Sequence, residues 1–213
     1  EHGKTVLRAL IAEADVFIHS MRAKAITKLG FGYAEVAAVN PAIVYTNCYG
    51  YGHRGPERDR PAYDDTIQAE CGLPAVQKEL TGEANYVASI VADKVAGLTA
   101  VYATMMALFH RERTGEGQEV EVAMFETMAS FMLVEHANGA MFDPPVGPAV
   151  YHRTIAPNRK PYRTKDGYIS ALIYNDKLWS GFIDAVQPAW NSERFFFNDT
   201  ATTEIYTIYA LVA

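Results

Sequence analysis

The chain has 213 residues, of which 49% are hydrophobic and 21% are charged, a composition typical of one globular domain or of one domain and part of another. Its net charge is −6 without long runs of one sign, so the charge predicts neither a nucleic-acid partner nor an anionic membrane partner. Cys48 and Cys71 are the only cysteines, too few for a metal cluster, and they indicate a cytoplasmic protein. Asp, His or Gly interrupts every apolar stretch before about 18 residues, and no membrane span is expected.

The first fifty residues alternate between helices and strands, as in an α/β fold. The chain begins without Met and directly in a helix, which we interpret as an α/β domain truncated at its N-terminus. The apolar strand over 42–50 is typical of parallel strands that are covered on both faces. The other elements that we predict in this region are a helix over 4–13, a strand over 15–19, a helix over 22–28 that stops at Gly30, and a short helix from 32 to Asn40.

A polar loop over 50–61 follows, and its glycines at 50, 52 and 55 spell G-x-G-x-x-G. This pattern binds dinucleotides when a helix begins at the third glycine, because the free N–H groups of that helix bind the pyrophosphate. Pro56 and Pro61 prevent such a helix here. The sequence therefore predicts a flexible loop and no nicotinamide or flavin site.

The clearest helix spans 93–111, and it is followed by a strand over 119–124 and a helix over 125–137. In the last of these, Met128, Phe131, Met132 and Glu135 fall on a common face. In the long helix, apolar side chains recur with helical spacing at Leu98, Val101, Tyr102, Met105, Leu108 and Phe109.

The remainder of the chain is predicted to contain a linker, the start of a second domain and a tail. Five of the ten prolines lie between Pro144 and Pro161, so we expect a partial Rossmann-like large domain over 1–141 and a Pro-rich linker over 142–165. Residues 166–194 begin a smaller α/β domain, with a strand over 167–175 and a helix capped by Asp176. Residues 195–213 contain "FFFNDTATTEIYT", which resembles a spurious translation of adapter DNA, so we assign this tail no function.

Several kinds of catalytic site have no support in the sequence. The six histidines lack ligand spacing, and no C-x-x-C occurs, so no metal is expected. No serine lies in G-x-S-x-G and neither cysteine lies in a nucleophile motif, which does not favour a hydrolase.

Two acidic stretches remain. Asp93 stands at the start of the long helix, where it is either a helix cap or a carboxylate nucleophile kept ionised by the helix dipole. Tyr63, Asp64 and Asp65 form either a solvated acidic turn or a group that positions the nucleophile.

Three segments together resemble class III CoA-transferases, the family that includes formyl-CoA and carnitine CoA-transferases and α-methylacyl-CoA racemases. They are "AYDDTIQAECG" at 62–72, the stretch at 92–128 that contains "RTGEGQEVEVAM", and "ADVFIHSMRAKAITKLG" with the residues that follow it to Pro56. The resemblance covers about Leu7 to Asp176. It implies an open Rossmann-like large domain, a linker, a smaller α/β domain and an interlocked homodimer, with no permanently bound cofactor.

The resemblance also implies roles for individual residues. Asp93 matches the catalytic aspartate, which forms a mixed anhydride and then an aspartyl-CoA thioester. Tyr63 matches an active-site tyrosine of the transferases at a position where the racemases have a histidine, and Asp64 matches an acid that hydrogen-bonds near the catalytic aspartate. The positions that match contacts to CoA are Ser20, Met21, Lys28 and Met124. Arg22 follows the same loop, and we expect it to add the local positive charge that the anionic CoA requires.

We therefore expect transfer of CoA between an acyl-CoA and a small carboxylic acid. The alternatives are an acyl-CoA racemase, for which Tyr63 is a poor base, and a non-catalytic CoA-binding fragment. The family's first strand and a catalytic glutamine precede residue 1, so we expect this chain alone to be inactive. Ser20-Met21 also replaces the family's usual Asn-Phe pair.

Overall fold

The computed structural model describes residues 1–186. The chain divides into a first unit, Glu1–Tyr151, and a second unit that begins at His152. The domain boundaries expected from the sequence stay predictions. The tail expected over 195–213 lies outside the described residues.

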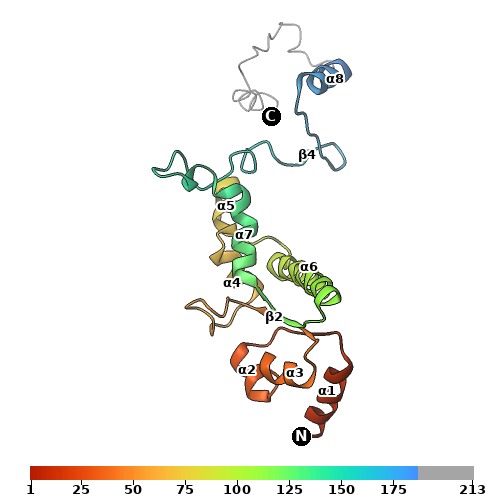
Figure 1. Cartoon of the computed structure of the whole chain (residues 1–213). Coiled ribbons are helices and arrows are strands. Elements are labelled where there is room, and N and C mark those ends of the chain that lie inside the picture. The colour runs from red at the N-terminus through yellow and green to blue at the C-terminus, as the bar shows by residue number, and fades with distance from the viewer. Residues whose placement is uncertain (187–213) are drawn as a thin grey trace. The chain divides into compact units, whose positions relative to one another are not determined.

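The first unit is a mixed α/β structure around a parallel sheet, which confirms the predicted fold class (Figure 1). The sheet order is β1 (Val16–His19), β2 (Val44–Tyr49) and β3 (Gln118–Ala123), with Val16 opposite Val44 and Tyr49 opposite Ala123. The helices of this unit are α1 (His2–Glu13), α2 (Ala23–Leu29), α3 (Tyr33–Val39), α4 (Asp64–Glu70), α5 (Leu73–Thr81), α6 (Val91–Thr114) and α7 (Met124–His136), followed by the 3₁₀ turn η1 (Asn138–Met141).

The sequence prediction of this unit failed at two helices. Residues 64–70 and 73–81 form α4 and α5, whereas the acids at 64 and 65 were considered only as a turn or as part of a catalytic group. Acids are favourable in the first turn of a helix because they face its positive end. Pro74 is also compatible with a first turn, since it lacks only an N–H group that the helix does not use there.

Two apolar clusters stabilise the first unit. The first joins α1, α2, α3 and β2 and contains Ile11, Ile26, Phe31, Val36, Ile43 and Tyr45. The second joins the loop after β2 to α4, α5, α6 and α7 and contains Tyr51, Ile67, Leu73, Ala92, Met128 and Met132. This second cluster surrounds the start of α6 and therefore supports the stretch that carries Asp93.

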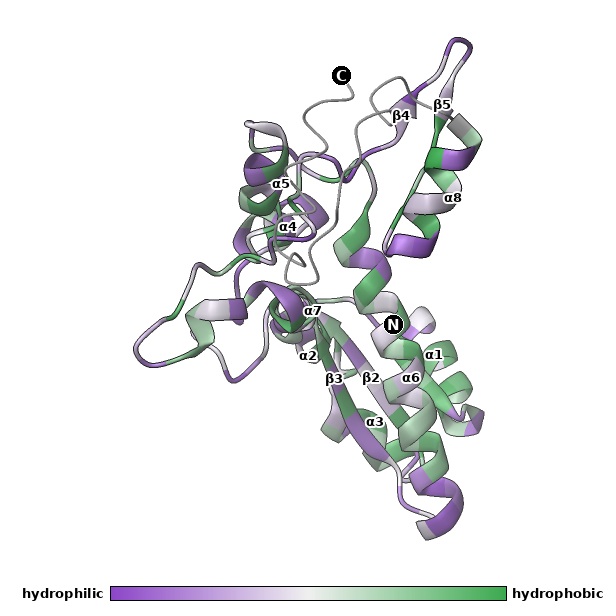
Figure 2. Ribbon diagram, turned by 90° about the horizontal axis from the view of Figure 1, so that it is seen from above, coloured by the Kyte–Doolittle hydropathy of each residue, from purple (hydrophilic) through white to green (hydrophobic). Residues whose placement is uncertain are grey.

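The large apolar residues of α6 lie on its exposed side, and the helix buries a different side. Figure 2 shows hydrophobic residues along much of α6, yet Leu98 and Phe109 are 68% and 64% exposed. The side chains that α6 buries are small ones, namely Ala92, Ala96, Ala100, Thr104 and Ala107. Small residues let the helix approach the sheet closely, and Thr104 Oγ1 lies 2.8 Å from Thr46 Oγ1 on β2. In α7 the predicted face is correct for the buried Met128 and Met132 and wrong for Phe131, which is exposed.

By length and composition, α6 is the one helix among the described residues that is long and apolar enough to cross a bilayer. The expectation that no segment reaches this threshold was therefore wrong. Single polar residues and glycines in the 24-residue helix do not bring its average hydropathy below the level typical of a membrane span. Core helices of water-soluble proteins meet the same criterion, and α6 packs its alanines inside the first unit.

The second unit contains an antiparallel pair, β4 (Tyr162–Arg163) and β5 (Tyr168–Ile169), and the helix α8 (Asp176–Val186). The strand predicted over 167–175 is therefore only two residues long. Asp176 is not the cap of α8, because the helix begins at this residue and the Asn175 Oδ1 atom accepts a hydrogen bond from the Leu178 N–H at 3.0 Å. The cap was predicted one residue too late.

Candidate active site

Asp93 lies at the end of α6 that faces the carboxyl edge of the sheet. The middle of α6 is attached to the middle of β2 through Thr104. Its last turns lie at the opposite edge, where the Arg111 guanidinium donates to the Asp15 carboxylate at 2.8 Å, just before β1 begins. Asp93 is 11 residues before Thr104, or about 16 Å along the helix axis. In open parallel sheets, ligands bind at this carboxyl edge.

The start of α6 is capped by an acid from another helix. Asp64, the first residue of α4, is only 8% exposed, and its Oδ1 atom accepts a hydrogen bond from the backbone N–H of Asp93 at 3.0 Å. This N–H belongs to the third residue of α6, whose own N-cap residue, Ile90, provides no side-chain acceptor. Asp64 thus performs for α6 the function of an N-cap side chain. The structure brings Asp64 and Asp93 together, as the sequence predicts.

Gln68 holds Asp64 in this position. Its Nε2 atom donates to Asp64 Oδ2 at 2.5 Å and to the carbonyl oxygen of Ser89 at 3.2 Å. Its Oε1 atom accepts from the Val87 N–H at 3.0 Å. The sequence analysis missed Gln68. The signal for it is the i, i+4 spacing from Asp64, which is informative only once residues 64–70 are recognised as a helix.

The carboxylate of Asp93 is exposed and accepts no hydrogen bond from the residues that the structure describes. Burial and then the nearby Asp64 charge raise its pKa above the ordinary 3.8. Both effects oppose the helix dipole, which favours the ionised form. The Asp64 carboxylate lies close to Asp93 because it accepts the hydrogen bond from the Asp93 backbone N–H. A more basic carboxylate is a stronger nucleophile once it is ionised.

Tyr63 precedes α4 and is 75% exposed, with an extended backbone (φ −133°, ψ 160°). It is next to Asp64 in the chain, so it lies beside the start of α6, and its side chain makes no hydrogen bond to the described residues. Asp65 is also exposed and forms no such bond. Of the side chains of this acidic stretch, that of Asp64 alone makes a hydrogen bond to the start of α6 among the described residues.

Most of the residues predicted to contact CoA lie at the same edge of the sheet. Ser20, Met21 and Arg22 follow the end of β1, and Met124 follows the end of β3. Because the strands are parallel, these ends are at one edge. Lys28 is in the last turn of α2, about 9 Å along the helix axis from Arg22.

The loop between β2 and α4 crosses this edge. Glu126 Oε1 accepts from the Gly52 N–H at 2.9 Å, and Glu121 Oε1 accepts from the His53 N–H at 2.8 Å. No helix begins at Gly55, as predicted, since the next helix is α4. The hydrogen bonds to two acids show that the loop, which was expected to be flexible, is attached to β3 and α7.

Positive charge gathers where this loop meets α2. Lys24 Nζ donates to Asp59 Oδ2 at 2.6 Å. This hydrogen bond is the main cause that lowers the pKa of Asp59, and the charges of Arg58 and Arg22 lower it further. The acidic chain thus has a local group of basic side chains at the carboxyl edge, the kind of site that an anionic ligand requires.

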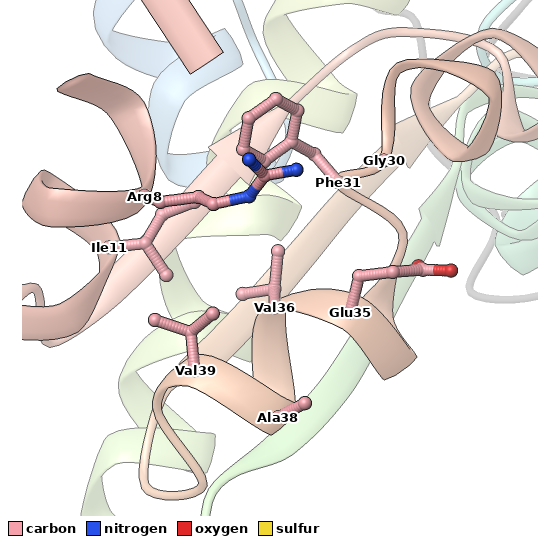
Figure 3. Close-up of a pocket in the computed structure, with 8 residues that line it drawn as sticks. All are labelled: Arg8, Ile11, Gly30, Phe31, Glu35, Val36, Ala38 and Val39. Carbon is pink, nitrogen blue, oxygen red and sulfur yellow. The ribbon is translucent and has the colours of Figure 1, made fainter. Parts of the chain in front are cut away.

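A pocket of about 330 Å³ lies elsewhere, between α1 and α3. Figure 3 shows the Arg8 guanidinium next to the ring of Phe31 on one side of this pocket and Val36 and Val39 on another. The Arg8 guanidinium carbon is 5.6 Å from the ring centre of Phe31. None of the predicted site residues lines it. We therefore place the candidate site at the start of α6. No group of three or more His, Cys, Asp or Glu side chains suited to a metal occurs in residues 1–186.

The chain is similar to known proteins in sequence and in fold. Succinate-glutarate CoA-transferase of Agrobacterium fabrum is 29% identical over 178 residues, which are 82% of this chain and 44% of that protein. A probable fatty acyl-CoA transferase of Mycobacterium tuberculosis is 30% identical over 189 residues, 84% of this chain and 48% of that protein. The crystal structure of a CAIB/BAIF family protein from Brucella suis superposes with a TM-score of 0.75 and 28% identity, over 88% of this chain and 50% of that protein.

The chain spans about half the length of these relatives. The sequence profile described as "CoA-transferase family III" matches residues 1–210. The chain therefore belongs to CoA-transferase family III.

Proposed function

We propose that the full-length protein transfers CoA from an acyl-CoA thioester to a carboxylic acid, with Asp93 as the nucleophile. The observation that carries this proposal is the arrangement at the start of α6. The Asp93 carboxylate is exposed and without a hydrogen bond to the described residues, while its backbone is held by the buried Asp64. A nucleophile needs this combination of a fixed backbone and an accessible reacting atom.

In the proposed reaction, an Asp93 oxygen attacks the thioester carbonyl and CoA leaves as a thiolate, giving a mixed anhydride. The thiolate then attacks the Asp93 carbonyl carbon, which releases the donor acid and leaves an aspartyl-CoA thioester. The acceptor carboxylate attacks this thioester, and the returning thiolate forms the new acyl-CoA and frees Asp93. Each step exchanges one acyl bond for another, so no redox partner is required.

The relatives support transfer over racemisation, since two of the proteins named above carry the names of a CoA-transferase and a probable fatty acyl-CoA transferase. Tyr63 favours the same choice, because a phenol is a weak base at neutral pH. An acyl-CoA racemase would exchange the α-hydrogen of its substrate with solvent. Incubation of the full-length protein with an acyl-CoA in D₂O should therefore give no deuterium at the α-carbon.

The proposed role of Asp93 can be tested by trapping. The full-length protein is incubated with a series of acyl-CoAs of increasing chain length and with hydroxylamine, which converts an aspartyl thioester or anhydride into a hydroxamate. We expect mass spectrometry of the digested protein to find the hydroxamate on Asp93. Asp65→Asn is a matched control, because it alters an exposed acid that makes no hydrogen bond to the described residues, and it should label normally.

An active enzyme whose Asp93 remains unmodified would contradict the proposed mechanism. Activity that survives in Asp93→Asn would contradict it independently. The basic side chains near Asp59 further predict that charge reversal at Arg22 raises the KM for acyl-CoA, because they supply positive charge at the edge where CoA phosphates would bind.

The remaining proposals concern the whole protein. We propose that it acts in the cytoplasm as an interlocked homodimer, with acyl-CoA and a small carboxylic acid as substrates and no permanent cofactor. We also propose that the 213-residue chain alone lacks normal turnover. Size-exclusion chromatography with light scattering of the full-length protein tests the dimer.

A further inference from the structure

Gln68 is a buried polar side chain near Asp93, and both its amide oxygen and its amide nitrogen make hydrogen bonds. It is 0% exposed, and its amide makes hydrogen bonds to Asp64, Ser89 and Val87. The orientation of the amide follows from its partners. A carboxylate and a carbonyl require donors, and a backbone N–H requires an acceptor. Rotation of the amide by 180° would place like groups together at all three contacts.

The hydrogen bonds of Gln68 to Val87 and Ser89 hold the segment that leads into α6. Residues 82–90 form neither helix nor strand, and Val87 and Ser89 are the fourth and second residues before α6 begins at Val91. The other backbone hydrogen bonds of this segment are short-range, such as those from the Ser89 N–H to Val87 and from the Val91 N–H to Ser89. Among the described residues, the hydrogen bonds that join this segment and the start of α6 to α4 are those of Gln68 and Asp64.

Gln68 and Asp64 act as a pair on one face of α4. They are four residues apart, so they lie one above the other on the helix surface. Asp64 bonds the N–H of Asp93, and Gln68 bonds both Asp64 and the residues just before α6. Displacing the amide would therefore move the backbone of Asp93 in two ways, through the Asp64 carboxylate and through the entry segment.

We propose that Gln68 is a positioning residue for the transfer reaction: by joining Asp64, Val87 and Ser89, it fixes the backbone of Asp93 and thereby the direction of the nucleophilic carboxylate. This inference rests on the proposed function of Asp93. Gln68 is 0% exposed, so we expect it to act through Asp93 and not by direct contact with the substrate. Its loss should therefore lower kcat and leave the KM for acyl-CoA unchanged.

The test compares Gln68→Met, Gln68→Glu and Gln77→Glu in the full-length protein with the acyl-CoA that labels best. Gln77 is a matched control because it lies on α5 and its side chain makes no hydrogen bond to the described residues. We expect Gln68→Met to lower kcat by about 10²-fold, the effect of a misplacement of about 1 Å in a reacting group. Rates are normalised to the folded fraction, measured by circular dichroism.

Gln68→Glu adds a readout that a purely structural role would not move. The introduced carboxyl group cannot donate to Asp64 when it is ionised, whereas its protonated form can. A buried acid that faces another acid keeps its proton to a higher pH than an exposed acid does. The activity of this variant relative to the wild type should therefore recover as the pH falls from about 8 to about 6, while that of Gln77→Glu should stay constant.

The outcomes separate this inference from the proposed function. If the wild type forms the Asp93 hydroxamate but both Gln68 variants match Gln77→Glu in kcat and in pH profile, the role of Gln68 is refuted and that of Asp93 stands. If the active wild type forms no hydroxamate, both fail. If Gln68→Met does not fold, the pH recovery of Gln68→Glu decides, and a flat ratio overturns the inference.

Discussion

Replacement of Asp64 by alanine tests the central contact of the site. Asp64 is buried, and its two oxygens have different partners, the Asp93 N–H at 3.0 Å and the Gln68 amide at 2.5 Å. Alanine removes both acceptors. The start of α6 loses its cap, and the buried Gln68 amide loses one of its two acceptors and keeps only the carbonyl of Ser89.

The expected cost has two parts. Loss of an N-cap acceptor destabilises a protein by about 1 kcal/mol. A buried donor left without its partner costs about 1 to 3 kcal/mol. Together they predict that Asp64→Ala lowers the free energy of unfolding by about 2 to 4 kcal/mol. Asp65→Ala should cost less than about 1 kcal/mol, because that exposed acid contributes only its interaction with the helix dipole.

Urea unfolding at neutral pH, followed by far-UV circular dichroism, measures both variants. The slope with urea should be unchanged, so that the shift in midpoint reports stability. Equal losses for Asp64→Ala and Asp65→Ala would refute the conclusion that Asp64 caps α6.

Three further variants test other parts of the structure. The raised pKa of Asp93 means that ionising this carboxylate destabilises the fold. Asp93→Asn should therefore raise the free energy of unfolding at pH values above the folded pKa and give no gain below the ordinary 3.8. Urea unfolding of both proteins across this pH range checks whether the gain appears only at the higher pH. In Gly50→Ala, the new Cβ would overlap the Cβ of Ala62, and urea unfolding should show a loss of about 1 to 3 kcal/mol. Ala100→Leu should cost a similar amount by overpacking α6 against its buried neighbours, and a neutral effect in thermal unfolding would contradict the close approach.

Local patterns were sufficient to predict most elements of the first unit. The apolar strand at 42–50 indicated a parallel sheet, and β2 is indeed paired in parallel on both sides. Gly30, predicted to end α2, has φ +84°, a conformation that glycine adopts without steric cost. These features depend on neighbours in the chain, so a sequence contains them directly.

The residues of α6 show where local reasoning fails. Helical spacing predicts that residues lie on one side of the helix, but it does not predict which side meets the sheet. The large residues, such as Leu98, are exposed, and the small ones, such as Ala100, are buried. Close approach to β2 through Thr104 decides this orientation, and it depends on a residue 58 positions away along the chain.

The sequence by itself determined the α/β class, the helix that carries Asp93 and the family resemblance, because short-range periodicity and motif spacing are properties of the chain. Only the tertiary structure decided that Asp64 caps α6 and that Gln68 makes hydrogen bonds both to Asp64 and to the segment just before α6. Hydrogen bonds between α4 and the start of α6 join residues 19 to 29 positions apart. Such bonds exist only after the intervening helix α5 has turned the chain back on itself, and no local pattern records that return.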